Sequence, residues 1–212
     1  MLSIIVAAGW PIWPLLLCSV LALALVIERF VSLKTAKVLP PKLLDEAIAA
    51  SQGGVPGPDV VTRLEQSSAL GEVLAAGFRT MNTHPRSTEE DVRVAMEARG
   101  RAVAHKLERY LPALATIASA APLLGLLGTV IGMIEIFGSQ SPASGGVGSG
   151  NPAQLAHGIS VALYNTAFGL IIAIPALIFW RYFRTRVDEY LLNLELAGER
   201  FARHLATLRS GK

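Results

Sequence analysis

Basic residues are absent from two long parts of this chain. The sequence of 212 residues has 19 Lys and Arg, yet none of them lies in residues 1–28 or 110–180. Arg29 follows the first gap, and the other eighteen lie in residues 34–109 and 181–212. Membrane proteins keep Lys and Arg on the cytoplasmic side of the bilayer. The pattern therefore predicts membrane spans, with the N-terminus outside and the C-terminus inside.

Residues that carry out chemistry are also scarce. The single cysteine, Cys18, excludes an internal disulfide and a Cys-based metal site. The four histidines are scattered, no nucleophile–base pair is present, and residues 139–152 lack the Gly-Lys-Ser/Thr ending of a phosphate-binding loop. The net charge of +3 belongs to the basic stretches and suggests contact with membrane lipid rather than nucleic acid. We expect no enzyme activity, cofactor or metal.

Three apolar segments are present instead. Residues 12–27 and 158–180 carry no charge, and residues 111–137 carry one. A helix needs about 20 apolar residues to cross a bilayer, a length that the first segment reaches from Trp10 to Phe30. We do not expect this first segment to be a cleaved signal peptide, because such peptides begin with basic residues. The predicted fold class is an all-α membrane protein with three transmembrane helices.

The charge pattern also divides the chain into regions. The predicted order is an outward N-terminus with the first span (1–33), a cytoplasmic helical region (34–110), the second span (111–137), a periplasmic Gly/Ser loop (138–154), the third span (155–180) and a cytoplasmic C-terminal helix (181–212).

Local signals predict helices in the basic regions. Residues 42–51 form a short helix, and a second helix begins at Asp59 and ends near residue 81. Ser87 and Glu90 have the spacing of a capping box. The helix that they begin has no clear stop before Gly138, although it contains Gly100 and Pro112, which cost helix stability or bend it. If it is continuous, its length is about 75 Å.

The C-terminal region has an apolar stripe at steps of three and four residues, which is typical of a helix. Two of the spans are therefore expected to extend into a cytoplasmic helical bundle that buries this stripe. Its members are Val187, Tyr190, Leu191, Leu194, Phe201, Leu205 and Leu208.

Small residues follow one side of each of the last two spans. They either let the two helices pack closely or line a shared interior on which Thr129 and Thr166 supply the hydroxyl groups. In the second span they are Ala121, Gly125, Gly128 and Gly132, and in the third they are Gly158, Ala162, Gly169 and Ala173.

Four further residues stand out within these spans. Glu135 is the only acid in them; because an acid in a membrane is costly, it either sits at the wetter mouth of the span or takes part in ion transfer. Asn165 either bonds between helices or belongs to the proton pathway. Pro122 and Pro175 are predicted to bend their helices.

These spans also carry motifs. Residues 118–133 read ASAAPLLGLLGTVIGM, residues 166–170 read TAFGL, and Ile174-Pro175-Ala176 follows. Together with Glu28-Arg29 at the end of the first span, they resemble the MotA/TolQ/ExbB proton channel family over nearly the whole chain. Three spans are similar to ExbB and TolQ rather than to MotA, which has an extra span.

The resemblance implies a homopentamer in the bacterial inner membrane. The second and third spans would surround single helices of a dimeric ExbD-like or TolR-like partner, which supplies an intramembrane Asp. Proton flow past Thr129 and Thr166 would drive movement that a TonB-like or TolA-like protein passes on. The implied role is to energise TonB-dependent uptake; the alternatives are the Tol–Pal envelope system and a passive scaffold for a partner.

One position departs from the family pattern. Enteric members have a glutamate five residues before the threonine of the third span, where this chain has Val161. Either the Asp of the partner carries the proton without it, which we favour, or Glu135 takes over part of its role.

Overall fold

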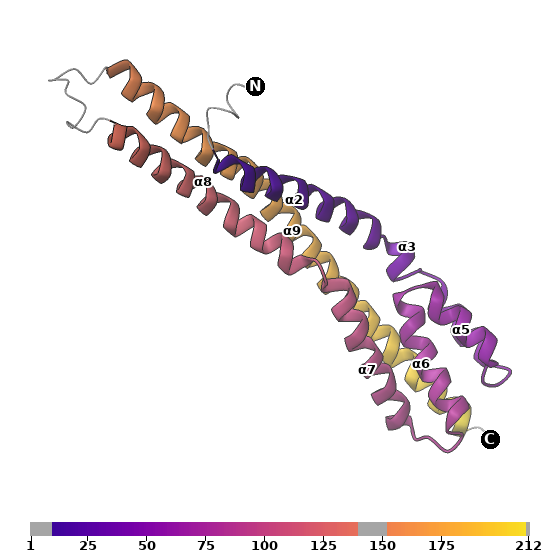
Figure 1. Ribbon diagram of the computed structural model, residues 1–212. Helices are drawn as coiled ribbons and strands as arrows, with labels where there is room; N and C mark the ends of the chain where they lie inside the picture. The colour runs from indigo at the N-terminus through magenta and orange to yellow at the C-terminus, as the bar shows by residue number, and fades with distance from the viewer. Residues whose placement is uncertain (1–9, 140–151, 211–212) are drawn as a thin grey trace. The chain divides into compact units, whose positions relative to one another are not determined.

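The computed structural model describes residues 10–139 and 152–210, and this part of the chain consists of helices without strands (Figure 1). The predicted all-α class is confirmed. Residues 1–9 and 140–151, which belong to the predicted N-terminus and outer loop, lie outside the described residues. The helices are α2 (Ile12–Ser32), α3 (Thr35–Val38), α4 (Leu43–Ser51), α5 (Pro58–Ser67), α6 (Ala69–Thr83), α7 (Glu89–Glu108), α8 (Leu111–Ser139) and α9 (Pro152–Ser210).

Three stretches of helix are long and apolar enough to cross a membrane. They lie within Ile12–Ser32, Glu89–Gly138 and Gly158–Thr207, as the sequence predicts. The chain forms two compact units. The first contains residues 1–28 and 111–181, and the second contains residues 29–110 and 182–212.

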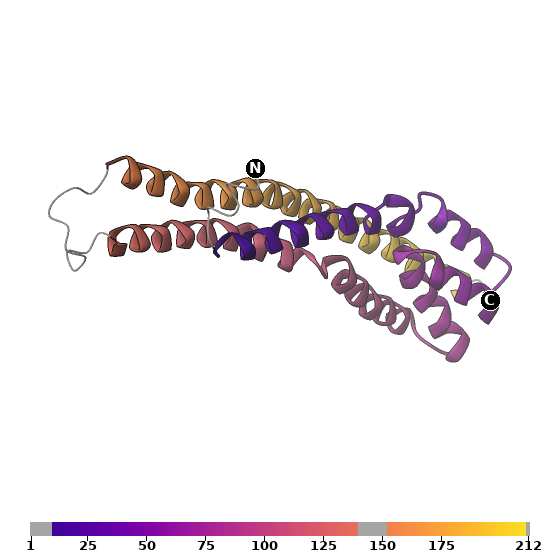
Figure 2. The ribbon, with the colours of Figure 1, turned by 45° about the horizontal axis from the view of Figure 1, so that its top comes forward.

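In the first unit, α8 lies beside the first part of α9 (Figures 1 and 2). Leu15 of α2 packs with Ala121 of α8 and Ala173 of α9 in a small buried cluster, so all three apolar helices contribute to this unit. Both α8 and α9 remain helical through their internal prolines, Pro122 and Pro175. The bends expected at these prolines stay a prediction.

In the second unit, the C-terminal part of α9 buries the apolar stripe. The rings of Phe78 and Phe201 meet edge to face, with centroids 4.9 Å apart. A Cβ atom at Gly77 would lie 2.9 Å from Sδ of Met96 and 3.5 Å from Leu205. The buried members of the stripe are Val187, Tyr190, Leu194, Phe201 and Leu205, while Leu191 is half-buried; the side chain of Leu208 lies outside the described part.

The prediction of one helix between Asp59 and residue 81 was wrong. Ser68 is extended, with φ −169° and ψ 170°, and separates α5 from α6. Its hydroxyl accepts a hydrogen bond from the backbone N–H of Gly71 at 3.0 Å, which caps α6. At Gly71 a Cβ atom would lie 2.1 Å from the carbonyl oxygen of Leu64, so only glycine fits this sharp turn.

The predicted capping box was one residue out of register. Thr88, not Ser87, caps α7: its hydroxyl accepts from the N–H of Asp91 at 3.1 Å, and the Asp91 carboxylate accepts from the N–H of Thr88 at 2.6 Å. The Ser87 N–H instead donates to the carbonyl of His84 at 2.9 Å. That turn uses the donor that a capping box at Ser87 would need.

The long helix predicted to run to Gly138 is two helices. A turn at Arg109–Tyr110 separates α7, which ends at Glu108, from α8, which begins at Leu111. Pro112 explains the break, because proline has no N–H to donate and clashes with the preceding turn. Pro112 is tolerated in the first turn of α8, because the N–H groups of a first turn have no partner within the helix.

Replacing Phe78 with alanine tests the core of the second unit. Removing a buried ring typically costs about 3–5 kcal/mol of folding free energy, so Phe78→Ala should clearly lower the midpoint of thermal unfolding in detergent. Val94→Ala, at a side chain that is half exposed on α7, is the matched control and should change it little. Equal midpoints for the two variants would contradict this core.

Candidate functional site

The backbones of α8 and α9 touch at two glycines of the first unit. A Cβ atom built on Gly125 would lie 2.7 Å from the carbonyl oxygen of Asn165 and 3.0 Å from the Cα of Thr166. One built on Gly169 would lie 2.6 Å from the carbonyl oxygen of Ala121 and 3.2 Å from the Cα of Gly125. Real Cβ atoms do not approach other atoms so closely, so these positions require glycine. The small-residue faces therefore pack helix against helix.

The same faces remain in register along α8 and α9. Towards the C-terminal end of α8, a Cβ atom on Gly132 would lie 3.1 Å from the Cβ of Ala162. One on Gly158 would lie 2.6 Å from the Cδ1 of Ile136. Partners on α9 come earlier in the chain as those on α8 come later, so the two helices are antiparallel. Ala173, at the other end of the face, is buried beside Ala121.

Asn165 lies inside this helix pair. Its side chain is 1% exposed, and a Cβ atom on Gly128 would lie 2.7 Å from its Cβ and 2.9 Å from its Nδ2. Gly128 therefore provides the space that the amide occupies. A polar side chain between apolar helices holds them in one register, because any other register would move the amide away from this space.

The two threonines occupy different surroundings. Thr166 is half-buried, and its backbone lies against Gly125. Thr129 is also half-buried, and its hydroxyl donates to the carbonyl of Leu126 at 2.7 Å. This bond uses the hydroxyl hydrogen and leaves the lone pairs of the Thr129 oxygen able to accept another donor.

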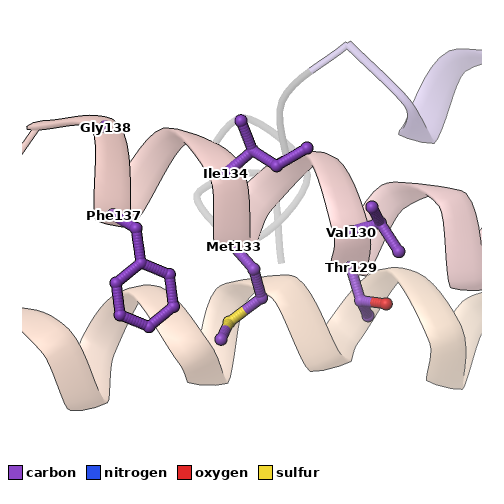
Figure 3. A pocket seen from close by; sticks show the side chains of 6 residues that line it. All are labelled: Thr129, Val130, Met133, Ile134, Phe137 and Gly138. Carbon is purple, nitrogen blue, oxygen red and sulfur yellow. The ribbon is translucent and has the colours of Figure 1, made fainter.

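Thr129 lines a hollow along α8 of about 590 Å³. Figure 3 shows Thr129, Met133 and Phe137 projecting from the same side of the helix, with Ile134 on the opposite side in this view. Val130 and Gly138 complete the lining, so the hollow is apolar apart from the one hydroxyl. Met133 and Phe137 carry no signal of their own in the sequence, although their steps of four residues from Thr129 place all three on one helix face.

The remaining predicted residues lie apart from these contacts. Glu135 is exposed on α8, two residues from Met133 in the hollow. Val161 belongs to α9, but its side chain lies outside the described part of the structure. The structure thus brings Asn165 together with the glycines, and it places Thr129 and Glu135 on outer faces of α8.

This chain is similar to known proteins over most of its length. Residues 65–196 match the family described as "MotA/TolQ/ExbB proton channel family". The "Putative biopolymer transport protein ExbB-like 3" of Synechocystis is 31% identical over 202 residues, which are 92% of this chain and 93% of that protein. "Biopolymer transport protein exbB1" of Vibrio cholerae is 30% identical over 190 residues, 88% of this chain and 80% of that protein.

Proteins named TolQ are also similar to this chain. The "Tol-Pal system protein TolQ" of Pseudomonas aeruginosa is 34% identical over 143 residues, 64% of this chain and 57% of that protein. The region 65–196 that matches the family contains every contact between α8 and α9 described above.

Gly125→Ala tests the backbone contact directly. The added methyl group must displace the backbone of α9, and overpacking of this kind typically costs about 1–3 kcal/mol. We expect a lower midpoint of thermal unfolding in detergent. Gly100→Ala is the control, because a Cβ atom there meets nothing within 4 Å and alanine favours a helix over glycine by about 1 kcal/mol. If Gly125→Ala were as stable as Gly100→Ala, the close approach would be wrong.

Proposed function

The chain is a member of the MotA/TolQ/ExbB proton channel family, and we propose that it is the channel subunit of an inner-membrane motor of the ExbB–ExbD type. The motor would use the proton motive force to energise TonB-dependent uptake across the outer membrane. The long matches to two biopolymer transport proteins support this role. The shorter TolQ match supports the alternative, a subunit of the Tol–Pal system.

The observation that carries the proposal is the glycine contact between α8 and α9. It makes these two apolar helices a closely packed pair, which is what a pore wall in a membrane requires. In the proposed assembly, five copies of the pair surround the single helices of an ExbD-like partner. The N-terminus would lie in the periplasm, and the second unit and C-terminus in the cytoplasm, in agreement with the basic residues.

The hollow on α8 suits this partner. Its lining of Met133, Ile134 and Phe137 is exposed or half-buried, and a membrane helix of the partner could cover it with apolar side chains. The Thr129 hydroxyl would then be the polar group that faces the partner there. In a membrane, a hydroxyl can accept a hydrogen bond from a protonated Asp without carrying a charge of its own.

Thr166 would serve the same pathway from α9. We propose that the partner's Asp carries the proton and that the threonine hydroxyls stabilise its two protonation states. The valine at position 161 fits this view, because the channel helix then needs no carboxylate of its own. Glu135, which is exposed on α8, would act at the mouth of the pathway, where water lowers the cost of a charge.

Replacement of Thr166 distinguishes a channel from a passive scaffold. Thr166→Val keeps the size of the side chain but removes the hydroxyl, so it should abolish proton-driven uptake while the complex still assembles. Thr166→Ser keeps the hydroxyl and should retain most of the uptake. The measurement is growth on siderophore-bound iron of a host whose own gene is deleted, together with a native gel of the complex.

The scaffold alternative gives a different result. A scaffold needs the packing of α8 against α9 but no hydroxyl, so it should tolerate Thr166→Val. Full growth with an assembled Thr166→Val complex would therefore overturn the assignment of the pathway.

Glu135→Gln should only weaken uptake. The substitution removes the charge at the proposed mouth but leaves the partner's Asp in place, so we expect growth that is slower than that of the wild type and faster than that of Thr166→Val. Uptake of radiolabelled iron–siderophore at several external pH values measures the difference. Complete loss of uptake at every pH would show instead that Glu135 replaces the glutamate that position 161 lacks.

A further inference from the structure

A basic notch lies in the second unit, where the end of α2 meets α9. Its volume is about 270 Å³. Three of its lining side chains are basic and three are aromatic, and none of those that the structure describes is acidic. These six, which define the basic notch, are Arg29, Lys34, Arg186, Phe30, Tyr182 and Phe183.

The positive charges of the notch are held in place by the fold. Arg29 is 2% exposed; its Nη1 donates to the carbonyl of Leu107 at 2.8 Å, and its guanidinium lies 4.9 Å from the ring centre of Tyr110. A buried guanidinium fixed in this way adds a permanent positive field to the notch. Lys34 is exposed at its edge, where the ammonium group can reach a ligand.

Tyr190 of α9 joins its helix to the residues at and after the end of α2. Its hydroxyl donates to the carbonyl of Leu33 at 2.9 Å. Because that bond uses the only hydrogen of the phenol, the Thr35 hydroxyl 3.0 Å away must be the donor in its bond with Tyr190. Arg186 also donates to the phenol oxygen, at 3.5 Å, and pairs with Glu189 through Nη1 at 3.1 Å. The notch is therefore preorganised, since its walls are joined by hydrogen bonds.

Aromatic rings form the other part of the notch. Phe30 packs edge to face on Phe183, with ring centroids 5.0 Å apart, and its centroid lies 6.2 Å from that of Tyr182. Phe30 and Tyr182 are each about half exposed. Exposed aromatic rings beside basic residues are typical of the level of the lipid headgroups. Their positions in the chain agree, because Phe30 and Tyr182 come two or three residues after the uncharged runs 12–27 and 158–180.

We propose that the basic notch binds the phosphate of an anionic glycerophospholipid, with the acyl chains lying against Phe30 and Tyr182. A phosphate diester carries one negative charge and accepts the hydrogen bonds that Lys34 and Arg186 can donate. Basic pockets next to membrane helices bind anionic headgroups in this way. The volume suits a headgroup rather than a whole lipid, which leaves the chains in the bilayer. The inference goes beyond the proposed motor function and does not depend on it.

Lipid titration tests the proposal on the full-length chain in a non-ionic detergent. Dioctanoyl phosphatidylglycerol is added to the wild type and to the double variant Lys34→Gln/Arg186→Gln, and binding is followed by calorimetry. Each basic residue near anionic lipid contributes a similar increment of affinity, so loss of two should weaken binding roughly thirtyfold. The control Lys37→Gln/Arg200→Gln removes two exposed charges outside the notch and should bind like the wild type.

Two further titrations distinguish a lipid phosphate from free phosphate as the ligand. Dioctanoyl phosphatidylcholine, which has no net charge, and inorganic phosphate should both bind weakly. If inorganic phosphate bound as tightly as the anionic lipid, the notch would be a site for soluble phosphate and the lipid proposal would be wrong. Equal affinity of the double variant and the control would also overturn it.

The folding of each variant is checked by its thermal unfolding without lipid. If the double variant is less stable than the wild type, Lys34→Gln alone replaces it, because Lys34 is exposed and its loss should leave the fold intact. The single variant should bind the anionic lipid several-fold more weakly than Lys37→Gln. The assay uses no proton flux, so its failure would leave the proposed channel function unaffected.

Discussion

The contact of two helix backbones at Gly125 and Gly169 is the constraint on which the first unit depends. Apolar side chains gain little by leaving lipid for a protein interior, so helices in a membrane are held mainly by close packing. Any side chain at these two positions would force α8 and α9 apart. Once the backbones touch there, the register of the pair is set. Gly128 then faces Asn165, Gly132 faces Ala162, and Gly158 faces Ile136.

This packing also divides the polar groups of the spans. The amide of Asn165 is enclosed between the helices, where it contributes to a fixed geometry. The Thr129 hydroxyl instead lines an apolar hollow on the outside of α8, where a partner can reach it. In the proposal, a rigid helix pair with a hydroxyl on its surface stabilises the Asp of a moving partner, since the wall keeps its shape while the partner changes its charge. The proposed motor would depend on the packing that these glycines allow.

The sequence predicts the spans well and the turns less well. The absence of charged residues predicts α2, α8 and the first part of α9 as membrane spans, because a helix needs about 20 apolar residues to cross a bilayer. The break at Ser68 is harder to predict, since serine lowers helix stability by less than about 1 kcal/mol and packing then decides. The break before Leu111 does have a local signal in Pro112. The contacts of the basic notch have no local signal at all: Tyr190 and Leu33 are 157 residues apart in the chain, and Arg29 and Leu107 are 78 apart. Glycine spacing predicts the helix contact itself, but the enclosed position of Asn165 depends on the exact register.

Native mass spectrometry of the complex, extracted gently from its own membranes, shows whether this chain is the subunit of a motor. The proposed motor predicts five copies of this chain together with about two copies of a smaller single-span protein. The sequence of that protein would also distinguish the uptake branch from the Tol–Pal branch. A monomer or dimer without a small partner, under conditions that keep other membrane complexes intact, would contradict the account, and the glycine faces would then be explained by helix packing alone.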